Sequence, residues 1–482
     1  MHRISKFLGA NLVLVSSLFI AQTSIPAQLP QHYELQDPSR TEAHVELTAK
    51  DLLEIEINRL QADPILRNAS WSFSLYDPVT NREILSYNDR TPLLPASTTK
   101  LLTTETAYAM LGPDYRWNTQ LEYSGEVGED GTLNGNLYIV GSGDPTLGKA
   151  AGGASSYWAI VSKFRDAIKE AGIRKVSGDI IIQNGIFKSD NIVLPPNIVW
   201  LEHNNYFLPA GSTQNIDPTK ERLVVKARNL LNDGKRYFYI SPYTGKQATA
   251  DSFDGAGSVS VKLPDAPYYL ANSLRTSLVK SGVSVAGKVV ARPIDAEPGI
   301  RNYLAREESP CLEDIIYFTN QTSSNAFAEA LLHSVGYLAT GDHTALSGRS
   351  TVTEHLSERG YDFTGLSYSD GSGLSRSNFV TAYSQVRFLA DIMKQPYYNS
   401  FLTSLPIAGQ TGTLKRMFNY SDANGRIFAK TGTLNRVKTL AGYINTNSGR
   451  TLTFSLLING YNGSVDQVKK RMEELLSPVL DL

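Results

Sequence analysis

The middle of the chain, from residue 119 to residue 305, has a different pattern from both flanks, and this change constrains the fold most. Strand-like segments separated by turn residues dominate it, at residues 118–127, 131–141, 178–187, 221–229, 235–243 and 257–264. Helical patterns interrupt them near residues 156–171 and 268–280. We interpret residues 119–305 as an inserted β-rich region, made of two nested domains.

The two flanks combine helical and strand patterns, so we expect residues 28–118 and 306–482 to form one discontinuous α+β domain. Before the insertion, residues 48–61 predict an amphipathic helix, and residues 71–87 predict a hairpin. The second flank predicts helices at 311–337 and 383–393, three strands at 426–434, 440–446 and 451–460, and a final helix at 465–477. The period of two and the short turns of the three strands favour an antiparallel sheet.

The N-terminus and the overall charge bear on location and partners. Arg3 and Lys6 precede an apolar run that ends at Ala21, and small and polar residues follow up to Ala27. This pattern is typical of a secretory signal peptide over residues 1–27, so we expect export to the periplasm without a stable membrane anchor. The net charge of −1 gives no basic excess that would favour nucleic acid. Cys311 is the only cysteine, so we expect no internal disulfide and a buried thiol.

The segment from Pro95 to Lys100 can form a nucleophile and its base. Ser97 and Lys100 are three residues apart, so in one helical turn their side chains lie on the same face. The lysine amine could then take the proton of the serine hydroxyl. A second Ser-x-x-Lys, at Ser277 and Lys280, falls late in an amphipathic helix, where we expect a surface serine.

Two further motifs suit acyl transfer without histidine, metal or cofactor. Ser323-Ser324-Asn325 offers a hydroxyl that could relay a proton and an amide that could hold a substrate carbonyl, although Ser86 and Ser189 begin competing Ser-x-Asn triplets. Lys430-Thr431-Gly432-Thr433 offers a positive charge for a substrate carboxylate and a glycine that permits close approach. The backbone N–H groups of Ser97 and Thr433 could form an oxyanion hole. Lys100 must lose its proton to act as a base, and we expect burial and the charge of Lys430 to lower its pKa.

The order of these motifs resembles the signature of penicillin-binding proteins and serine β-lactamases. Residues 141–147, 370–376 and 405–409 and the long insertion narrow the resemblance to class C low-molecular-mass penicillin-binding proteins, the D-alanyl-D-alanine carboxypeptidase/endopeptidase family with inserted domains. It implies a transpeptidase-like catalytic domain, an acyl-enzyme on Ser97, peptidoglycan stem peptides as substrates and β-lactams as inhibitors. It also implies substrate-binding roles for residues 431–433 and a role for Arg376 in shaping the cleft. It favours Ser323 over Ser189 as the first serine of the Ser-x-Asn motif.

Some alternatives stay open at this point. One alternative is a serine β-lactamase. A class A enzyme would need a glutamate that activates water between the second and third motifs, where Glu354 and Glu358 lie without the expected context. A non-catalytic peptidoglycan-binding protein is the other alternative. The balance between carboxypeptidase and endopeptidase is open, and so is the preferred third stem residue. In relatives that bind a diaminopimelate side chain an acidic residue precedes an Ile-Phe pair, whereas here residues 183–185 before Ile186 are not acidic.

Overall fold

The computed structural model describes residues 47–149, 152–183, 266–292, 299–342 and 344–482, together with short strands between residues 205 and 262. The predicted signal peptide, the rival Ser189 and the Ile186-Phe187 pair lie outside the described residues. In the part of the chain that is described, none of the helices combines the length and the apolar character needed to cross a membrane.

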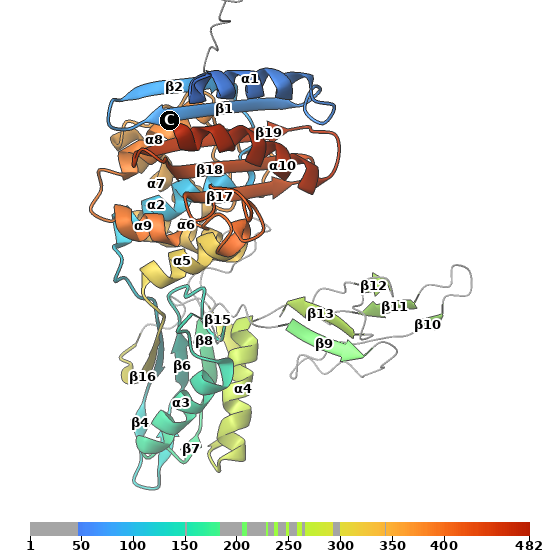
Figure 1. The fold of residues 1–482 in the computed structure, drawn as a ribbon. Coiled ribbons are helices and arrows are strands. Elements are labelled where there is room, and N and C mark those ends of the chain that lie inside the picture. The colour runs from blue at the N-terminus through green and yellow to red at the C-terminus, as the bar shows by residue number, and fades with distance from the viewer. Residues whose placement is uncertain are drawn as a thin grey trace, which may run out of the picture. The chain divides into compact units, whose positions relative to one another are not determined.

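A five-stranded antiparallel sheet joins the two flanks of the insertion, in the order β17-β18-β19-β1-β2 (Figure 1). Its strands are β1 (Ser70–Asp77), β2 (Arg82–Tyr87), β17 (Ile427–Leu434), β18 (Val437–Asn445) and β19 (Thr451–Asn459). Phe73 of β1 lies opposite Leu456 of β19, so the two flanks of the insertion meet in one sheet. The predicted hairpin, the three C-terminal strands and the antiparallel sheet are confirmed, and β17 lies at one edge.

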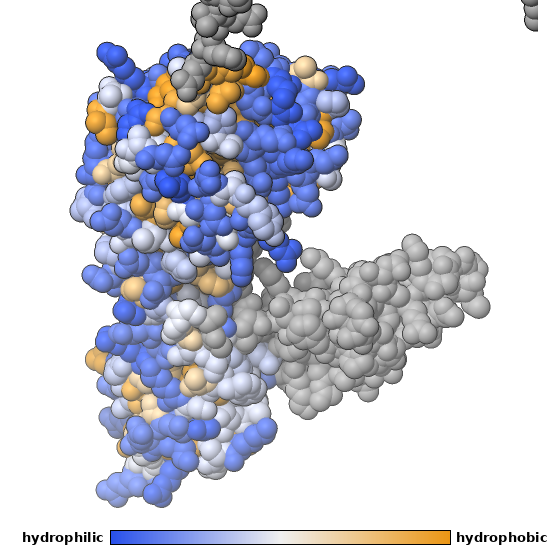
Figure 2. Space-filling model, in the orientation of Figure 1, coloured by the Kyte–Doolittle hydropathy of each residue, from blue (hydrophilic) through white to orange (hydrophobic). Residues whose placement is uncertain are grey.

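Helices pack on both faces of this sheet, and nearly all residues of β1, β18 and β19 are buried. On one face α1 (Ala49–Ala62) and α10 (Val465–Leu476) share a hydrophobic core with β1 and β19. The other face is covered by α2 (Lys100–Leu111), α5 (Leu312–Thr322), α6 (Asn325–Thr340), α7 (Ala345–Glu358), α8 (Ala382–Ile392) and α9 (Tyr398–Ser404). On the surface, hydrophobic side chains gather near α1 (Figure 2), which exposes Leu52 and Ile55.

The inserted region is rich in strands, as predicted, and some of its described strands pair in parallel. Its larger sheet has the order β15-β8-β6-β3-β16, and β8 pairs in parallel with β6 and β15. Parallel neighbours need a crossover connection, and α3 (Tyr157–Glu170) and α4 (Ala266–Lys280) supply helices for it. The larger sheet consists of β3 (Asn118–Tyr123), β6 (Leu137–Val140), β8 (Ile180–Gln183), β15 (Val289–Arg292) and β16 (Asn302–Glu308). A smaller sheet consists of β4 (Glu126–Val127), β5 (Thr132–Asn134), β7 (Lys175–Val176) and β14 (Ser284–Val285).

Strand pairing bears on the expected domain boundaries. β16 pairs with β3, so a boundary between residues 305 and 306 would divide a strand of the inserted sheet, and we move the proposed boundary to the end of β16. Between β8 and α4, the described strands pair with one another. They are β9 (Asn205–Pro209), β10 (Arg228–Asn229), β11 (Arg236–Tyr239), β12 (Gln247–Thr249) and β13 (Ser258–Lys262). A second nested domain remains our prediction for this stretch.

Candidate active site

Ser97 lies in a short 3-10 turn, η1 (Ala96–Thr99), which leads directly into α2. The α-helix therefore begins at Lys100, three residues later than a helix opening at Ser97 would begin. Ala96 has a φ of 47°, a left-handed conformation that is unfavourable for a residue with a Cβ. The turn thus holds Ser97 in a backbone arrangement that the surrounding structure must enforce.

Hydrogen bonds from three elements enforce this turn. The carbonyl of Pro95 accepts hydrogen bonds from Thr98 Oγ1 at 2.8 Å and from Thr439 Oγ1 of β18 at 2.7 Å. Gln385 of α8 donates to Thr98 Oγ1 at 3.1 Å. On β17, a Cβ at Gly432 would lie 2.9 Å from the Ser97 nitrogen, which is too close for any other residue. The glycine of the Lys-Thr-Gly motif therefore lets the edge strand approach the nucleophile.

Lys100 is fully buried and has three hydrogen-bond partners around its amine. Its Nζ lies 3.0 Å from Ser97 Oγ, 2.7 Å from Asn325 Oδ1 and 2.6 Å from the Ser372 carbonyl. Burial lowers the pKa of Lys100 to about 7, although nearby carboxylates oppose this shift. The expected lowering by burial is confirmed. The charge of Lys430 is not among the causes of the Lys100 shift, whereas the charge of Lys100 contributes to lowering the pKa of Lys430.

Lys430 is also fully buried and pairs with the first serine of the Ser-x-Asn motif. Its Nζ donates to Ser323 Oγ at 2.9 Å and to the Thr431 carbonyl at 3.0 Å. Burial, followed by the charges of Lys100 and Lys438, lowers the pKa of Lys430 well below its usual range. Lys100 and Lys430 repel each other strongly when both are protonated. An anionic ligand beside Lys430 would therefore favour protonation of Lys430.

The second motif, Ser323-Ser324-Asn325, forms the junction between α5 and α6. Ser323 adopts a left-handed conformation with a φ of 57°, which ends α5, and Ser324 is the N-cap of α6, accepting a hydrogen bond from the Phe327 N–H. Asn325 is therefore the first residue of α6, where its side chain reaches Lys100. The structure thus brings Ser97, Lys100, Ser323, Asn325 and Lys430 together, as the sequence motifs predict.

The glycine-rich segment at residues 370–376 is held by a buried carboxylate that the sequence analysis missed. Glu329 accepts hydrogen bonds from the backbone N–H groups of Gly371 at 3.3 Å and Ser372 at 2.9 Å. Burial raises the pKa of Glu329. Glu329 follows Asn325 by four residues on α6, and that spacing, which puts both side chains on one helix face, is the signal that could have found it.

The remaining predicted binding residues lie along β17 and the adjacent turn. Thr431 Oγ1 donates to Thr413 Oγ1 at 2.7 Å. Thr433 is exposed at the edge, and its hydroxyl accepts a hydrogen bond from Lys438, a second residue that the sequence analysis missed. Arg376 is exposed and donates to the Asn435 carbonyl at 2.7 Å, so it joins the glycine-rich segment to the β17–β18 turn.

The competing residues lie elsewhere or are already bonded. Ser277 is on α4 in the inserted region, where Arg165 approaches it at 3.5 Å, and Ser86 donates to Glu83 in the hairpin. Glu354 is exposed on α7, as is Glu358. The expectation of a buried thiol is wrong: Cys311 is partly exposed at the start of α5, where its thiol donates to Asp314.

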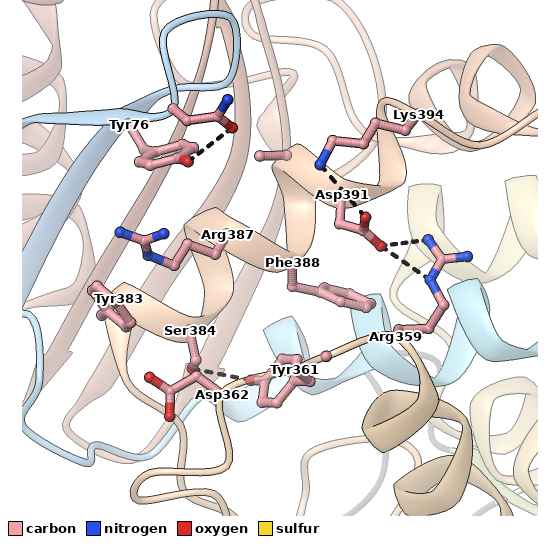
Figure 3. A pocket seen from close by; sticks show the side chains of 13 residues that line it. Tyr76, Arg359, Tyr361, Asp362, Tyr383, Ser384, Arg387, Phe388, Asp391 and Lys394 are labelled. Atoms are coloured by element: carbon pink, nitrogen blue, oxygen red, sulfur yellow. Dashed lines mark hydrogen bonds and ion pairs between the residues drawn. The ribbon is translucent and has the colours of Figure 1, made fainter.

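A recess of about 380 Å³ lies on another part of the domain (Figure 3). Its walls come from β1, from the end of α7 and from α8, and its charged groups are largely paired, as in the ion pair of Arg359 with Asp391. None of the motif residues lines it. Among the described residues, no cluster of histidine, cysteine, aspartate and glutamate side chains is arranged to hold a metal ion.

A serine turn, a Ser-x-Asn junction and a Lys-Thr-Gly edge strand around two buried lysines define the class of penicillin-binding proteins and serine β-lactamases. Within it, the chain belongs to the D-Ala-D-Ala carboxypeptidase 3 (S13) family, whose model matches residues 53–252 and 250–478. The resemblance inferred from the motifs is thereby confirmed, and the chain is a peptidase of this family.

Individual relatives agree with this assignment. A D-alanyl-D-alanine carboxypeptidase from an Actinomadura species is 29% identical over 446 residues, covering 85% of this chain and 81% of the relative. The D-alanyl-D-alanine carboxypeptidase DacB of Haemophilus influenzae is 26% identical over 425 residues, covering 81% and 86%. The crystal structure of penicillin binding protein 4 from Haemophilus influenzae matches with a TM-score of 0.72 at 22% identity, covering 90% of this chain and all of that one, which supports the fold.

Proposed function

We propose that this protein is exported and cleaves D-Ala-D-Ala stem peptides of peptidoglycan through an acyl-enzyme on Ser97, and that β-lactams acylate the same serine and inhibit it. The observation that carries this proposal is the 3.0 Å contact between Ser97 Oγ and the buried Lys100 amine. Curated relatives named as D-alanyl-D-alanine carboxypeptidases support the substrate class, and one related structure contains a bound β-lactam.

Acylation would use the neutral form of Lys100. With a pKa of about 7, a large share of the amine is unprotonated near neutral pH and can accept the Ser97 proton. The serine oxygen then attacks the carbonyl carbon of the penultimate D-alanine, and the backbone N–H groups of Ser97 and Thr433 stabilise the developing oxyanion. Asn325, bonded to Lys100, would hold the peptide carbonyl of the substrate.

Departure of the terminal D-alanine requires a proton on its nitrogen. Ser323 is the candidate donor, because its hydroxyl bonds to Lys430 at 2.9 Å and can be reprotonated from that amine. Lys430, with Thr431 and Thr433 beside it, would bind the terminal carboxylate of the substrate. Before deacylation Lys100 must be neutral again, so the proton taken from Ser97 has to pass on and replace the one that Ser323 and Lys430 gave to the leaving amine. Water then attacks the ester carbonyl and gives a proton to Lys100, and Lys100 returns it to Ser97 Oγ as the ester bond breaks and the shortened peptide leaves.

The direct test is product analysis with a synthetic stem peptide ending in D-Ala-D-Ala. We expect release of one D-alanine per peptide by the native protein and none by Ser97→Ala, while Ser277→Ala stays active. Turnover of penicillin without release of D-alanine would instead identify a β-lactamase. Binding of peptidoglycan without turnover of either compound would identify a non-catalytic protein. Digestion of purified cell-wall fragments, followed by mass spectrometry, would separate carboxypeptidase from endopeptidase products.

A further inference from the structure

A third buried lysine lies behind the substrate-binding edge of β17, outside the three motifs. Lys438 is on β18, directly opposite Thr433 in the strand register, and only 4% of it is exposed. Its Nζ lies 2.7 Å from Thr433 Oγ1. A buried ammonium group is unfavourable unless it has a hydrogen-bond partner, and the hydroxyl of Thr433 is such a partner for Lys438.

This contact fixes the direction of the Thr433 hydroxyl. A protonated lysine has three donors and no acceptor, so Thr433 Oγ1 must accept the hydrogen bond. The one hydrogen of the hydroxyl is then directed away from Lys438. Thr433 is exposed on β17, which is an edge strand of the sheet, so this donor is available to a ligand that lies along that edge.

We propose that Lys438 is a positioning residue that selects substrates with a free terminal carboxylate, by holding the Thr433 hydroxyl as a donor and placing positive charge behind it. The inference rests on the proposed function, because it assigns the carboxylate of the peptide to this edge of β17. Lys438 itself does not contact substrate. It acts through Thr433, which distinguishes it from Lys430 on the strand that carries the motif.

The charged groups around Lys438 make its effect depend on pH. Lys469 and Asp466 of α10 form an ion pair at 3.0 Å; Lys469 lowers the pKa of Lys438, and Asp466 raises it. Lys438 also repels the buried Lys430 of β17. Burial, with a smaller contribution from Lys469, lowers the pKa of Lys438 to about 8. Above that pH the neutral amine can accept a hydrogen bond, so the Thr433 hydrogen can turn toward it and away from the substrate.

The test compares two acyl peptides that differ only at the C-terminus, a free D-Ala-D-Ala carboxylate and its uncharged amide. We expect Lys438→Met to raise KM for the carboxylate about 3- to 10-fold, the effect of about one hydrogen bond, and to change KM for the amide and both kcat values less than twofold. Lys469→Met is the matched control, because it removes a nearby lysine that does not touch Thr433. The rise in KM for the carboxylate above about pH 8 should be weaker in Lys438→Met than in the native protein.

A double variant separates positioning from a general loss of structure. If Lys438 acts through Thr433, Lys438→Met should change KM less than twofold in a Thr433→Val background. Equal losses on the two peptides, or a full additional loss in that background, would overturn the proposal. Penicillin labelling of Ser97 in every variant keeps this result separate from the proposed function, because a missing label would count against the acyl-enzyme and not against Lys438.

Discussion

Glu329 Oε1 accepts a hydrogen bond from the Ser372 N–H at 2.9 Å, and the carbonyl of the same Ser372 accepts one from Lys100 Nζ at 2.6 Å. One peptide segment therefore connects a buried carboxylate on α6 to the base on α2. Glu329 also opposes the lowering of the Lys100 pKa, so it influences the base by position and by charge.

Replacement of Glu329 should therefore change both the acylation rate and the pH dependence of that rate. Glu329→Gln removes a negative charge that raises the pKa of Lys100, so the acid limb of the acylation profile should move to lower pH. The amide of glutamine has one acceptor oxygen where the carboxylate has two, so the N–H of Gly371 or Ser372 should lose its partner. The glycine-rich segment that contacts Lys100 would then be held less firmly, and acylation should slow about 10- to 100-fold. Stopped-flow acylation between about pH 5 and pH 9 measures both effects. Glu354→Gln, on exposed α7, is the control, and an unshifted acid limb in Glu329→Gln would refute the electrostatic link.

Lys100→Arg tests whether the base must be neutral. Arginine keeps the positive charge but cannot be deprotonated in a protein, so this variant should lose acylation almost as fully as Lys100→Ala. In the native protein the acylation rate should rise with pH through an apparent pKa near 7. A Lys100→Arg variant that acylates within about tenfold of the native rate would contradict the role of Lys100 as general base.

Lys430→Ala tests carboxylate binding directly. A charge-assisted contact contributes about 1.5–3 kcal/mol, so kcat/KM for a D-Ala-D-Ala peptide should fall about 10- to 150-fold. A neutral thioester that lacks the terminal carboxylate should be affected far less. Steady-state kinetics on both substrates decide the matter, and equal losses would show that Lys430 has no carboxylate-specific role.

The buried lysines should also make the folded state less stable near neutral pH than at high pH. The pKa of Lys100 is about 7 in the folded protein and near 10.5 in the unfolded chain, so the unfolded chain binds more protons between these values. The destabilisation is complete below about pH 7, decreases as pH rises, and disappears above about pH 10.5. Lys100→Met should therefore raise the free energy of unfolding near pH 7 by about 2–5 kcal/mol. Urea denaturation at several pH values is the measurement, and a gain that does not shrink by about pH 10 would contradict this explanation.

The sequence predicted those parts of the site that depend on local spacing. Ser97 and Lys100 are three residues apart in one turn, and Ser323 and Asn325 lie at a helix junction, so motif and geometry coincide. Lys438 could not be recognised in this way, because its contact with Thr433 depends on the register of two strands. Burial of Lys100 was expected from the sequence, but the groups that surround its amine needed the structure, because they come from α6 and the glycine-rich segment.

In the inserted region, too, the sequence predicted local elements but not how they pair. Strand patterns located β3, β6 and β8, but period and composition do not reveal which strands pair in parallel. The helices are the clue, α3 between β6 and β8 and α4 between β8 and β15, because parallel neighbours need a long crossover. The start of α2 at Lys100 likewise reflects the constrained turn at Ala96, which no local propensity predicts.

Mass spectrometry of tryptic peptides after a short reaction with penicillin tests the acyl-enzyme most directly. The peptide that contains Ser97 should gain the mass of one penicilloyl group, and Ser97→Ala should carry no label. The adduct should persist far longer than the acylation step, as expected for a peptidase rather than a β-lactamase. A label on Ser277, or a fully folded native protein that acquires no label on any serine, would contradict the assignment of Ser97 as the nucleophile.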